Sequence, residues 1–254
     1  MMHGGLGGVL GRWYEHLACG IIRRCGFPFY GVSGDVCRWL KTFGISAAGT
    51  LPNAVDPEEL AVLARAEDRT DWRQRLQVPA DGHLVAFVGR LIPEKGALQL
   101  AKAVQQLPGC VLAVAGTGPE EEALRAMGGS VHALGALPHA QIVQLLSQAD
   151  CYCLPTEYAE GFPTTLLEAA ACRCPIVCTH TAGTGELLPD GDYAVYLDDT
   201  RPESLAAALT TVLQDPGASR QRCERAFRNL AEHFTWQAVF ATMMKTAQNA
   251  QSAR

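Results

Sequence analysis

Two carboxylates eight residues apart, Glu160 and Glu168, are well placed to act on one ligand. Glu160 begins the run Glu-Gly-Phe-Pro, and Glu168 lies about two turns inside a helix predicted for residues 164–172. Free backbone N–H groups and the helix dipole at the start of such a helix favour an anion. Pro163 is predicted to occupy the first turn, a position that proline tolerates. The two carboxylates can therefore face one anionic ligand that spans the helix end.

A strand lies on each side of this helix. Residues 150–154 and 175–179 are short apolar runs of strand type. Pro175 cannot continue a helix, so the helix ends before it. Strand, loop, helix and strand in this order predict a parallel crossover unit.

A second loop between a strand and a helix carries positive charge. Residues 84–88 predict a buried strand, and a helix is predicted to run from the end of the next loop to about residue 107. The loop between them contains Gly89, Arg90 and Lys95. A basic, glycine-containing loop that leads from a strand into a helix is an anion-binding arrangement.

These motifs resemble the signature of retaining GT-B glycosyltransferases of the family 4 group, which includes glycogen synthase and sucrose synthase. The hallmark of that family is two glutamates separated by seven residues, as in residues 160–168, although Pro163 stands where glycine is common. Residues 89–96 resemble the family's G-R-L-x-x-x-K-G, in which Arg and Lys hold the donor diphosphate. The resemblance extends over about residues 3–245, with its motifs in order and at the right spacing.

The resemblance implies a role for each matching side chain. Arg90 and Lys95 would stabilise the charge that grows on the leaving diphosphate, Glu160 would contact the donor sugar, and Glu168 the ribose. His3, in a His-Gly pair that faces the cleft in many members, joins Arg90, Lys95 and Glu160 as a catalytic candidate. The donor-binding positions are Gly89, Gly118, Leu134, Gly161, Phe162, Pro163, Thr164, Thr165 and Glu168.

The family's chemistry is a same-face substitution that is assisted by the leaving group and retains the anomeric configuration. No Asp-x-Asp pair occurs in a donor-site loop, so we expect neither a metal nor another cofactor. The expected partners are a nucleotide sugar and a glycan or lipid-linked acceptor.

The fold class that the resemblance implies is α/β of GT-B type, with a complete Rossmann-like C-terminal domain and a partial N-terminal Rossmann-like domain. Residues 1–56 would be the remnant of the N-terminal acceptor domain, and residues 57–80 a connection. Residues 81–235 would bind the nucleotide sugar, and residues 236–254 would form a helix that crosses back. A doubly wound half needs several more strands, so roughly 90–100 residues are missing relative to a typical domain. We therefore interpret the chain as truncated or as half of a split enzyme, for which another chain would supply the missing strands.

The first 56 residues are read from short patterns. A basic amphipathic helix is predicted for residues 8–25, and its apolar stripe fits either packing on a sheet or contact with a membrane surface. Strands are predicted for residues 27–32 and 49–51, and a helix for residues 35–43. Ser33 or Asp35 would cap this helix.

Composition excludes several classes of protein. The net charge of −5 argues against a nucleic-acid-binding protein, which would usually be basic. No apolar run approaches the ~20 residues needed to cross a bilayer, and no signal-peptide pattern begins the chain. The ten cysteines lie in apolar segments and lack the spacing of a tetrahedral metal site, so buried free thiols are expected. These features indicate a cytoplasmic protein, with the inner face of the membrane as an alternative location.

Two other functions compete with transfer. The first is a non-catalytic nucleotide-sugar-binding module, which is considered because the acceptor half of the cleft is incomplete. Such a module would share every donor residue with the transferase. In either case we expect this chain to bind donor better than it transfers sugar. A Rossmann-type dehydrogenase or epimerase is disfavoured, since residues 116–121 depart from G-x-G-x-x-G at the last position.

Overall fold

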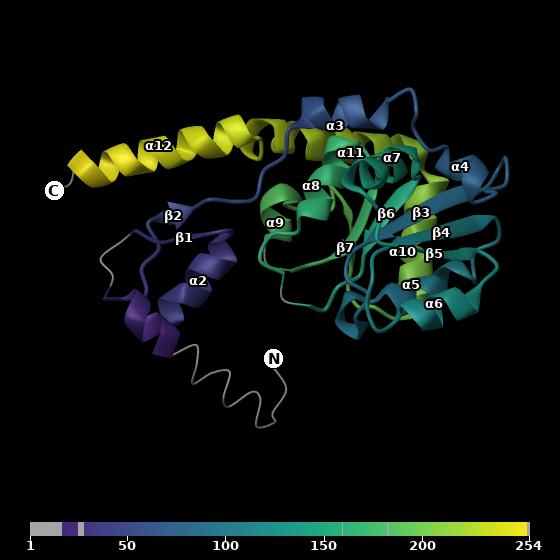
Figure 1. Cartoon of the computed structure of the whole chain (residues 1–254), viewed down its shortest axis with the longest axis horizontal. Helices are drawn as coiled ribbons and strands as arrows, with labels where there is room; N and C mark the ends of the chain where they lie inside the picture. Colours follow the sequence, from purple (N-terminus) through teal and green to yellow (C-terminus); the bar gives the residue numbers. More distant parts are fainter. Residues whose placement is uncertain (1–16, 25–27, 159, 182, 253–254) are drawn as a thin grey trace.

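The computed structural model describes residues 17–24, 28–158, 160–181 and 183–252 (Figure 1). The candidate residue His3 and most of the helix predicted for residues 8–25 lie outside this range. Within it, residues 17–22 are helical and a turn follows at residues 23–24.

Six parallel strands form the main sheet, in the order β5-β4-β3-β6-β7-β8. They are β3 (His83–Val88), β4 (Cys110–Ala115), β5 (Val131–Gly135), β6 (Cys151–Leu154), β7 (Ile176–Thr179) and β8 (Val195–Leu197). The chain winds outward from β3 to β5 and then returns to place β6 on the other side of β3. The parallel α/β sheet predicted from the alternating strand and helix patterns is therefore confirmed.

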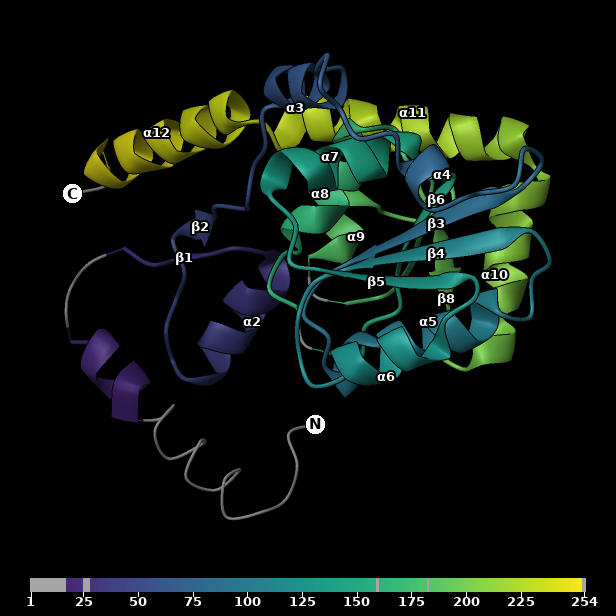
Figure 2. The ribbon, with the colours of Figure 1, turned by 45° about the vertical axis from the view of Figure 1, so that its right-hand side comes forward.

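Helices cover both faces of this sheet (Figure 2). One face carries α5 (Ala97–Val104), α6 (Glu121–Met127) and α10 (Pro202–Gln214). The other carries α3 (Pro57–Ala64), α4 (Trp72–Arg75), α7 (His139–Gln148), α8 (Thr164–Ala171) and α11 (Pro216–His233). In β3, Ala86 packs into one apolar cluster and its neighbour Phe87 into the other. A strand buried on both faces needs a continuous apolar sequence, which is what residues 84–88 supply.

A second, much smaller sheet holds the N-terminal segment. It pairs β1 (Tyr30–Gly31) with β2 (Gly49–Thr50), and α2 (Gly34–Thr42) connects them. Both strands are shorter than predicted. Pro28 precedes β1 and Pro52 follows β2, and proline cannot donate to a strand ladder.

The predicted cap of α2 is present. The Ser33 hydroxyl accepts a hydrogen bond from the backbone N–H of Val36 at 3.3 Å. Gly44 follows the helix with φ of +71°, the left-handed conformation that favours glycine after a helix end.

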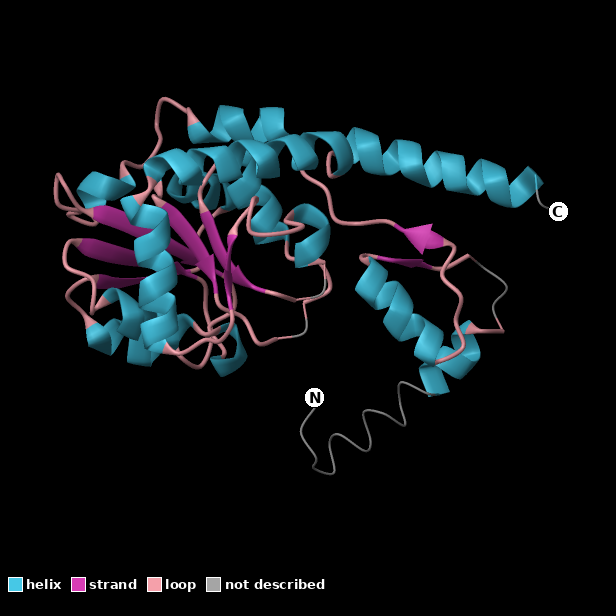
Figure 3. Cartoon of the chain, turned by 180° about the vertical axis from the view of Figure 1, so that it is seen from behind, coloured by secondary structure: helices cyan, strands magenta, loops and turns pink. Residues whose placement is uncertain are grey.

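The last helix, α12 (Trp236–Ser252), extends beyond the main sheet and passes the small one (Figures 1 and 3). The backbone N–H of Val55 donates to the carbonyl of Phe234 at 3.0 Å, just before this helix. An added Cβ at Gly49 in β2 would lie 3.9 Å from Thr246 of α12. The final helix thus contacts the N-terminal segment. None of the described helices combines the length and the apolar character needed to span a membrane.

Two glycines let the loops after β3 and β4 touch. An added Cβ at Gly116, where φ is +144°, would lie only 1.8 Å from the carbonyl oxygen of Gly89. At Gly118 it would lie 2.4 Å from the carbonyl oxygen of Leu91. The backbone N–H of Gly89 donates to Ala115 O at 3.0 Å, which fixes the start of the loop that carries Arg90.

We expect Gly116→Ala to displace this loop, because no flexible side chain can make room for the methyl group. Gly128→Ala is the matched control, since its φ of +55° is also left-handed but nothing lies within 4 Å of an added Cβ. The control should lower stability by ~1–3 kcal/mol from backbone strain alone, because its ψ of −158° belongs to a region that is essentially restricted to glycine. Thermal unfolding should show a larger loss for Gly116→Ala, and equal losses would contradict the close contact.

Candidate functional site

Four of the candidate residues gather where the winding of the main sheet reverses, between β3 and β6. The loop after β3 carries Gly89, Arg90 and Lys95, and the loop after β6 carries Glu160. Ligands of open α/β sheets bind at the carboxyl ends of the strands at such a switch point. The fold therefore brings together two loops that are far apart in the sequence.

Lys95 and Glu160 form an ion pair across these loops. Their side chains are only 11% and 12% exposed. The hydroxyl of Thr156, itself buried, lies 3.4 Å from the same Glu160 oxygen and 3.3 Å from the carbonyl of Glu94. A buried ion pair with a further hydrogen bond holds both side chains in one place.

Tyr158 lies beside the two cations of the β3 loop. The guanidinium carbon of Arg90 is 5.0 Å from the centroid of the Tyr158 ring, and Nζ of Lys95 is 5.4 Å from it. Both distances are within the range of cation–π attraction. Arg90 is exposed, so its charge can reach a ligand from solvent.

The start of α8 offers backbone donors, and here the sequence prediction for Pro163 was wrong. Pro163 is the extended residue before the helix, with φ of −68° and ψ of 117°, and Thr164 is the first helical residue. A proline in the first turn would have occupied a position whose N–H is free for a ligand. With the proline one residue earlier, the N–H groups of the first turn stay available, and no side chain caps them.

Phe162 fixes the entry to α8. It is buried and its ring stacks on Phe234, with the centroids 5.2 Å apart. Its carbonyl accepts a hydrogen bond from the Asn53 side chain at 2.7 Å. Gly183 adopts φ of +81°, and an added Cβ there would lie 2.7 Å from the carbonyl of Gly161. These contacts hold the Gly161–Phe162 segment in one position at the start of α8.

Thr165 differs from Thr164 in what its side chain does. The hydroxyl of Tyr152 donates to Thr165 Oγ1 at 2.7 Å, and Tyr152 is fully buried in β6. Burial raises the pKa of Tyr152 far above its usual value, so the phenol stays neutral and remains a donor. Thr164 is exposed, and its side chain is open to a ligand.

Glu168 is partnered by a histidine that the sequence did not single out. Nε2 of His139, the first residue of α7, lies 3.1 Å from Oε1 of Glu168. The Glu168 side chain is 13% exposed. Burial raises the pKa of Glu168, and the charge and hydrogen bond of His139 oppose that shift.

The structure does not join all the candidate residues into one contact network. Glu160 and Glu168 each contact a different basic partner. Leu134 lies in β5 and packs against the apolar core. Gly118 touches the loop after β3 through its backbone.

Two contacts to the N-terminal segment were missed by the sequence analysis. Asn53 reaches Phe162, and the Glu186 carboxylate accepts a hydrogen bond from the backbone N–H of Gly34 at the start of α2. Glu186 lies in α9 (Thr184–Leu187). These partners lie more than 100 residues away in the sequence, so no local pattern indicates them.

The cysteines that the structure describes are free thiols, as expected, and most are buried. Burial raises the pKa of Cys151, Cys153 and Cys174 well above the usual thiol value, so these groups stay protonated. Within the described ranges, no group of three or more His, Cys, Asp or Glu side chains could hold a metal ion.

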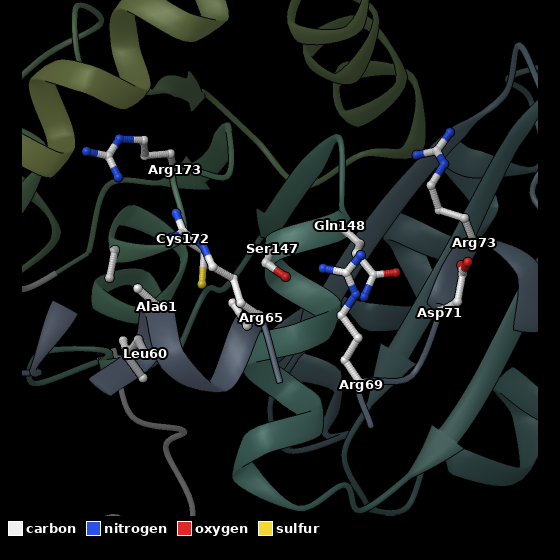
Figure 4. A pocket seen from close by; sticks show the side chains of 12 residues that line it. Leu60, Ala61, Arg65, Arg69, Asp71, Arg73, Ser147, Gln148, Cys172 and Arg173 are labelled. Carbon is white, nitrogen blue, oxygen red and sulfur yellow. The ribbon is translucent and has the colours of Figure 1, made fainter. Parts of the chain in front are cut away.

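A hollow of about 500 Å³ lies near the amino-terminal ends of the strands, opposite the candidate site, where α3, α7 and α8 end (Figure 4). Four arginines line it: Arg65, Arg69, Arg73 and Arg173. Arg73 is bound to Asp150 at 2.7 Å, and Arg173 to Glu224 at 3.0 Å. Helix C-termini favour positive charge, which explains these side chains without a ligand.

Comparison with known proteins places the chain in a family. A family model described as "Glycosyl transferases group 1" matches residues 68–230. The glycogen synthase of Mycobacterium tuberculosis is 33% identical over 192 residues, which cover 71% of this chain and 46% of that protein. The putative teichuronic acid biosynthesis glycosyltransferase TuaC of Bacillus subtilis is 35% identical over 145 residues, or 57% of this chain and 36% of that protein. The chain thus spans about half the length, or less, of these curated relatives.

Solved structures show the same fold. Anabaena Alr3699/HepE, in complex with UDP and glucose, matches with a TM-score of 0.79 at 20% identity, covering 92% of this chain and 66% of that one. The C-terminal domain of LpcC from Francisella tularensis matches with a TM-score of 0.56 at 18% identity, covering 72% of this chain and 99% of that one. The predicted α/β fold with a Rossmann-like, GT-B-type domain is confirmed, whereas the retaining mode stays a prediction. Because the family model matches more than half of its length, the chain belongs to the group 1 glycosyltransferases.

Proposed function

We propose that this chain is the donor-binding part of a glycosyltransferase that moves a sugar from a nucleotide sugar to a glycan or lipid-linked acceptor, with retention of configuration. The observation that carries the proposal is the meeting of Arg90, Lys95 and Glu160 beside the uncapped start of α8. Two structures of HepE are complexes, one with UDP and glucose and one with UDP-glucose, which supports a similar donor here. In this proposal residues 81–235 bind the donor.

Each part of the site has a role in breaking the bond between the anomeric carbon and the diphosphate. Negative charge grows on the leaving diphosphate, and Arg90, Lys95 and the first N–H groups of α8 would stabilise it. Glu160 would contact the sugar and Glu168 the ribose hydroxyls. Because these cations can stabilise the leaving group directly, we propose transfer without a metal ion.

The alternative is a non-catalytic nucleotide-sugar-binding module or one half of a split enzyme. The small β1–β2 sheet favours it, since within the described chain this sheet has only two strands and offers little surface to an acceptor. Another chain that adds strands beside β1 or β2 would then complete the cleft.

We further propose a cytoplasmic location, because buried free thiols are typical of a reducing compartment. Peripheral contact with the inner face of the membrane is a further proposal for the helical segment at residues 17–22. Leu17 and Ile21 in this segment are both exposed.

The function is tested by titration calorimetry of the chain with UDP-glucose, ADP-glucose and GDP-mannose, with and without a chelator. We expect micromolar or tighter binding of one donor that the chelator does not change. Transfer is then followed by NMR with oligosaccharide and lipid-linked acceptors, where an unchanged anomeric configuration would support retention. Failure to bind any of the donors would contradict the proposal, and binding without transfer would favour the module.

We expect Arg90→Ala and Lys95→Ala each to weaken nucleoside diphosphate binding by about 10- to 100-fold. Each removes a charged hydrogen-bonding partner worth roughly 1.5–3 kcal/mol. Arg225→Ala is the matched control, because Arg225 pairs with Asp192 on an exposed part of α11. Unchanged affinity in both site variants, measured by calorimetry, would show that the diphosphate binds elsewhere.

Glu168→Gln should have opposite effects on stability and on nucleoside binding. The raised pKa of Glu168 means that the folded protein binds a proton more readily than the unfolded chain does. The ionised side chain therefore lowers stability in full above its folded pKa. This loss shrinks as the pH falls through the folded pKa and vanishes below the unfolded pKa. At pH 8 we expect Glu168→Gln to melt at a temperature equal to or above that of the wild type.

The same substitution should weaken nucleoside binding at pH 8, because an amide is a weaker acceptor for the ribose hydroxyls than a carboxylate. In the wild type, affinity should fall on acidification through the raised pKa of Glu168, and the variant should lack this dependence. Glu67→Gln, at an exposed loop position, serves as the control. Retained affinity in Glu168→Gln would remove Glu168 from the ribose site.

A further inference from the structure

Tyr158 contacts both cations of the proposed diphosphate site. Its ring centroid is 5.0 Å from Cζ of Arg90 and 5.4 Å from Nζ of Lys95. We propose that Tyr158 is a positioning residue that orients the two cations for the diphosphate, an inference that rests on the proposed function. One aromatic ring would thus organise charges that repel each other.

The backbone holds Tyr158 against the loop that it organises. Its N–H lies 3.2 Å from the carbonyl of Glu94 and 3.1 Å from the hydroxyl of Thr156. Glu94 directly precedes Lys95. At Gly96, where φ is +73°, an added Cβ would lie 2.4 Å from the carbonyl of Pro155. The loops after β3 and β6 are therefore in backbone contact, and this contact keeps the Tyr158 ring beside Lys95.

The cation–π contact with Tyr158 does not use the N–H groups of Arg90 as hydrogen-bond donors to an oxygen. A guanidinium presents its N–H groups in its own plane, whereas an aromatic ring contacts its face. Arg90 makes no ion pair within the described part of the chain, so the ring is the contact that restrains it. Held beside the ring, Arg90 can then bind phosphate oxygens through its N–H groups, from a position set before the ligand arrives.

Glu160 acts on Lys95 in the opposite sense. Its carboxylate forms an ion pair with the ammonium group of Lys95. A free nucleoside diphosphate, which brings no sugar for Glu160 to bind, must compete with this ion pair. The ring of Tyr158 attracts Lys95 without occupying its N–H groups in the same way. Loss of the ring should therefore weaken diphosphate binding.

The ring is also accessible, since Tyr158 is 39% exposed. Its influence should reach the phosphates and not the nucleoside, because Glu168 and His139 lie on α8 and α7 instead. Binding of a nucleoside without phosphates should be independent of Tyr158. This independence distinguishes orientation of the cations from a general support of the loop.

The test is titration calorimetry of the full chain with UDP, ADP and GDP and with uridine, adenosine and guanosine. Tyr158→Ala should weaken the diphosphate that the wild type binds best by about 3- to 30-fold, the range that two cation–π contacts can supply. Tyr158→Phe keeps the ring and should stay within about twofold of the wild type. Tyr158→Leu keeps bulk without the ring and should behave like Tyr158→Ala.

Several results would overturn the inference. Unchanged diphosphate affinity in Tyr158→Ala, or wild-type affinity in Tyr158→Leu, would show that the ring does not orient the cations. An equal loss in Tyr158→Phe would assign the effect to the hydroxyl. Parallel losses of diphosphate and nucleoside affinity would show that the loop had collapsed. Lack of diphosphate binding by the wild type would instead overturn the proposed function, and this inference with it.

Discussion

The buried ion pair between Lys95 and Glu160 is the interaction on which the candidate site depends. It joins the loops after β3 and β6, which leave the sheet on the two sides of its switch point. Removing one partner of a buried pair leaves a charge without compensation and typically costs ~3–5 kcal/mol. Such a pair adds little net stability over an apolar contact. Its presence at the end of two apolar strands therefore fits a ligand site better than a purely structural role.

Backbone packing supports this pair. Glycines at positions 96 and 116 sit where an added Cβ would strike a carbonyl oxygen of the neighbouring loop. The loops therefore approach as closely as main chains allow. This contact fixes the backbone positions from which their side chains extend. The charged groups then need few further contacts. Tyr158 and Thr156 supply these contacts from the β6 side.

The sequence predicted the repeating part of this arrangement well. Buried parallel strands need continuous apolar runs, as in residues 84–88. A glycine or proline closely follows some of the helices, such as α6 and α10. Ser33 was recognised as a candidate cap because caps depend on neighbours close in sequence. The sequence did not predict the partners of the polar side chains. His139 meets Glu168, and Asn53 meets Phe162, across separations that only the tertiary fold closes.

The misplacement of Pro163 has a related origin. A proline fits both before and inside the first helical turn, because its fixed φ suits either position. Phe162 resolves the choice, since its ring is anchored on Phe234 and its carbonyl on Asn53. Residues from the N-terminal segment and from the end of α11 thus determine where α8 begins. The start of α8 is therefore set partly by the N-terminal segment, through Asn53. In the proposed function, a change in that segment would reach the donor site through this contact.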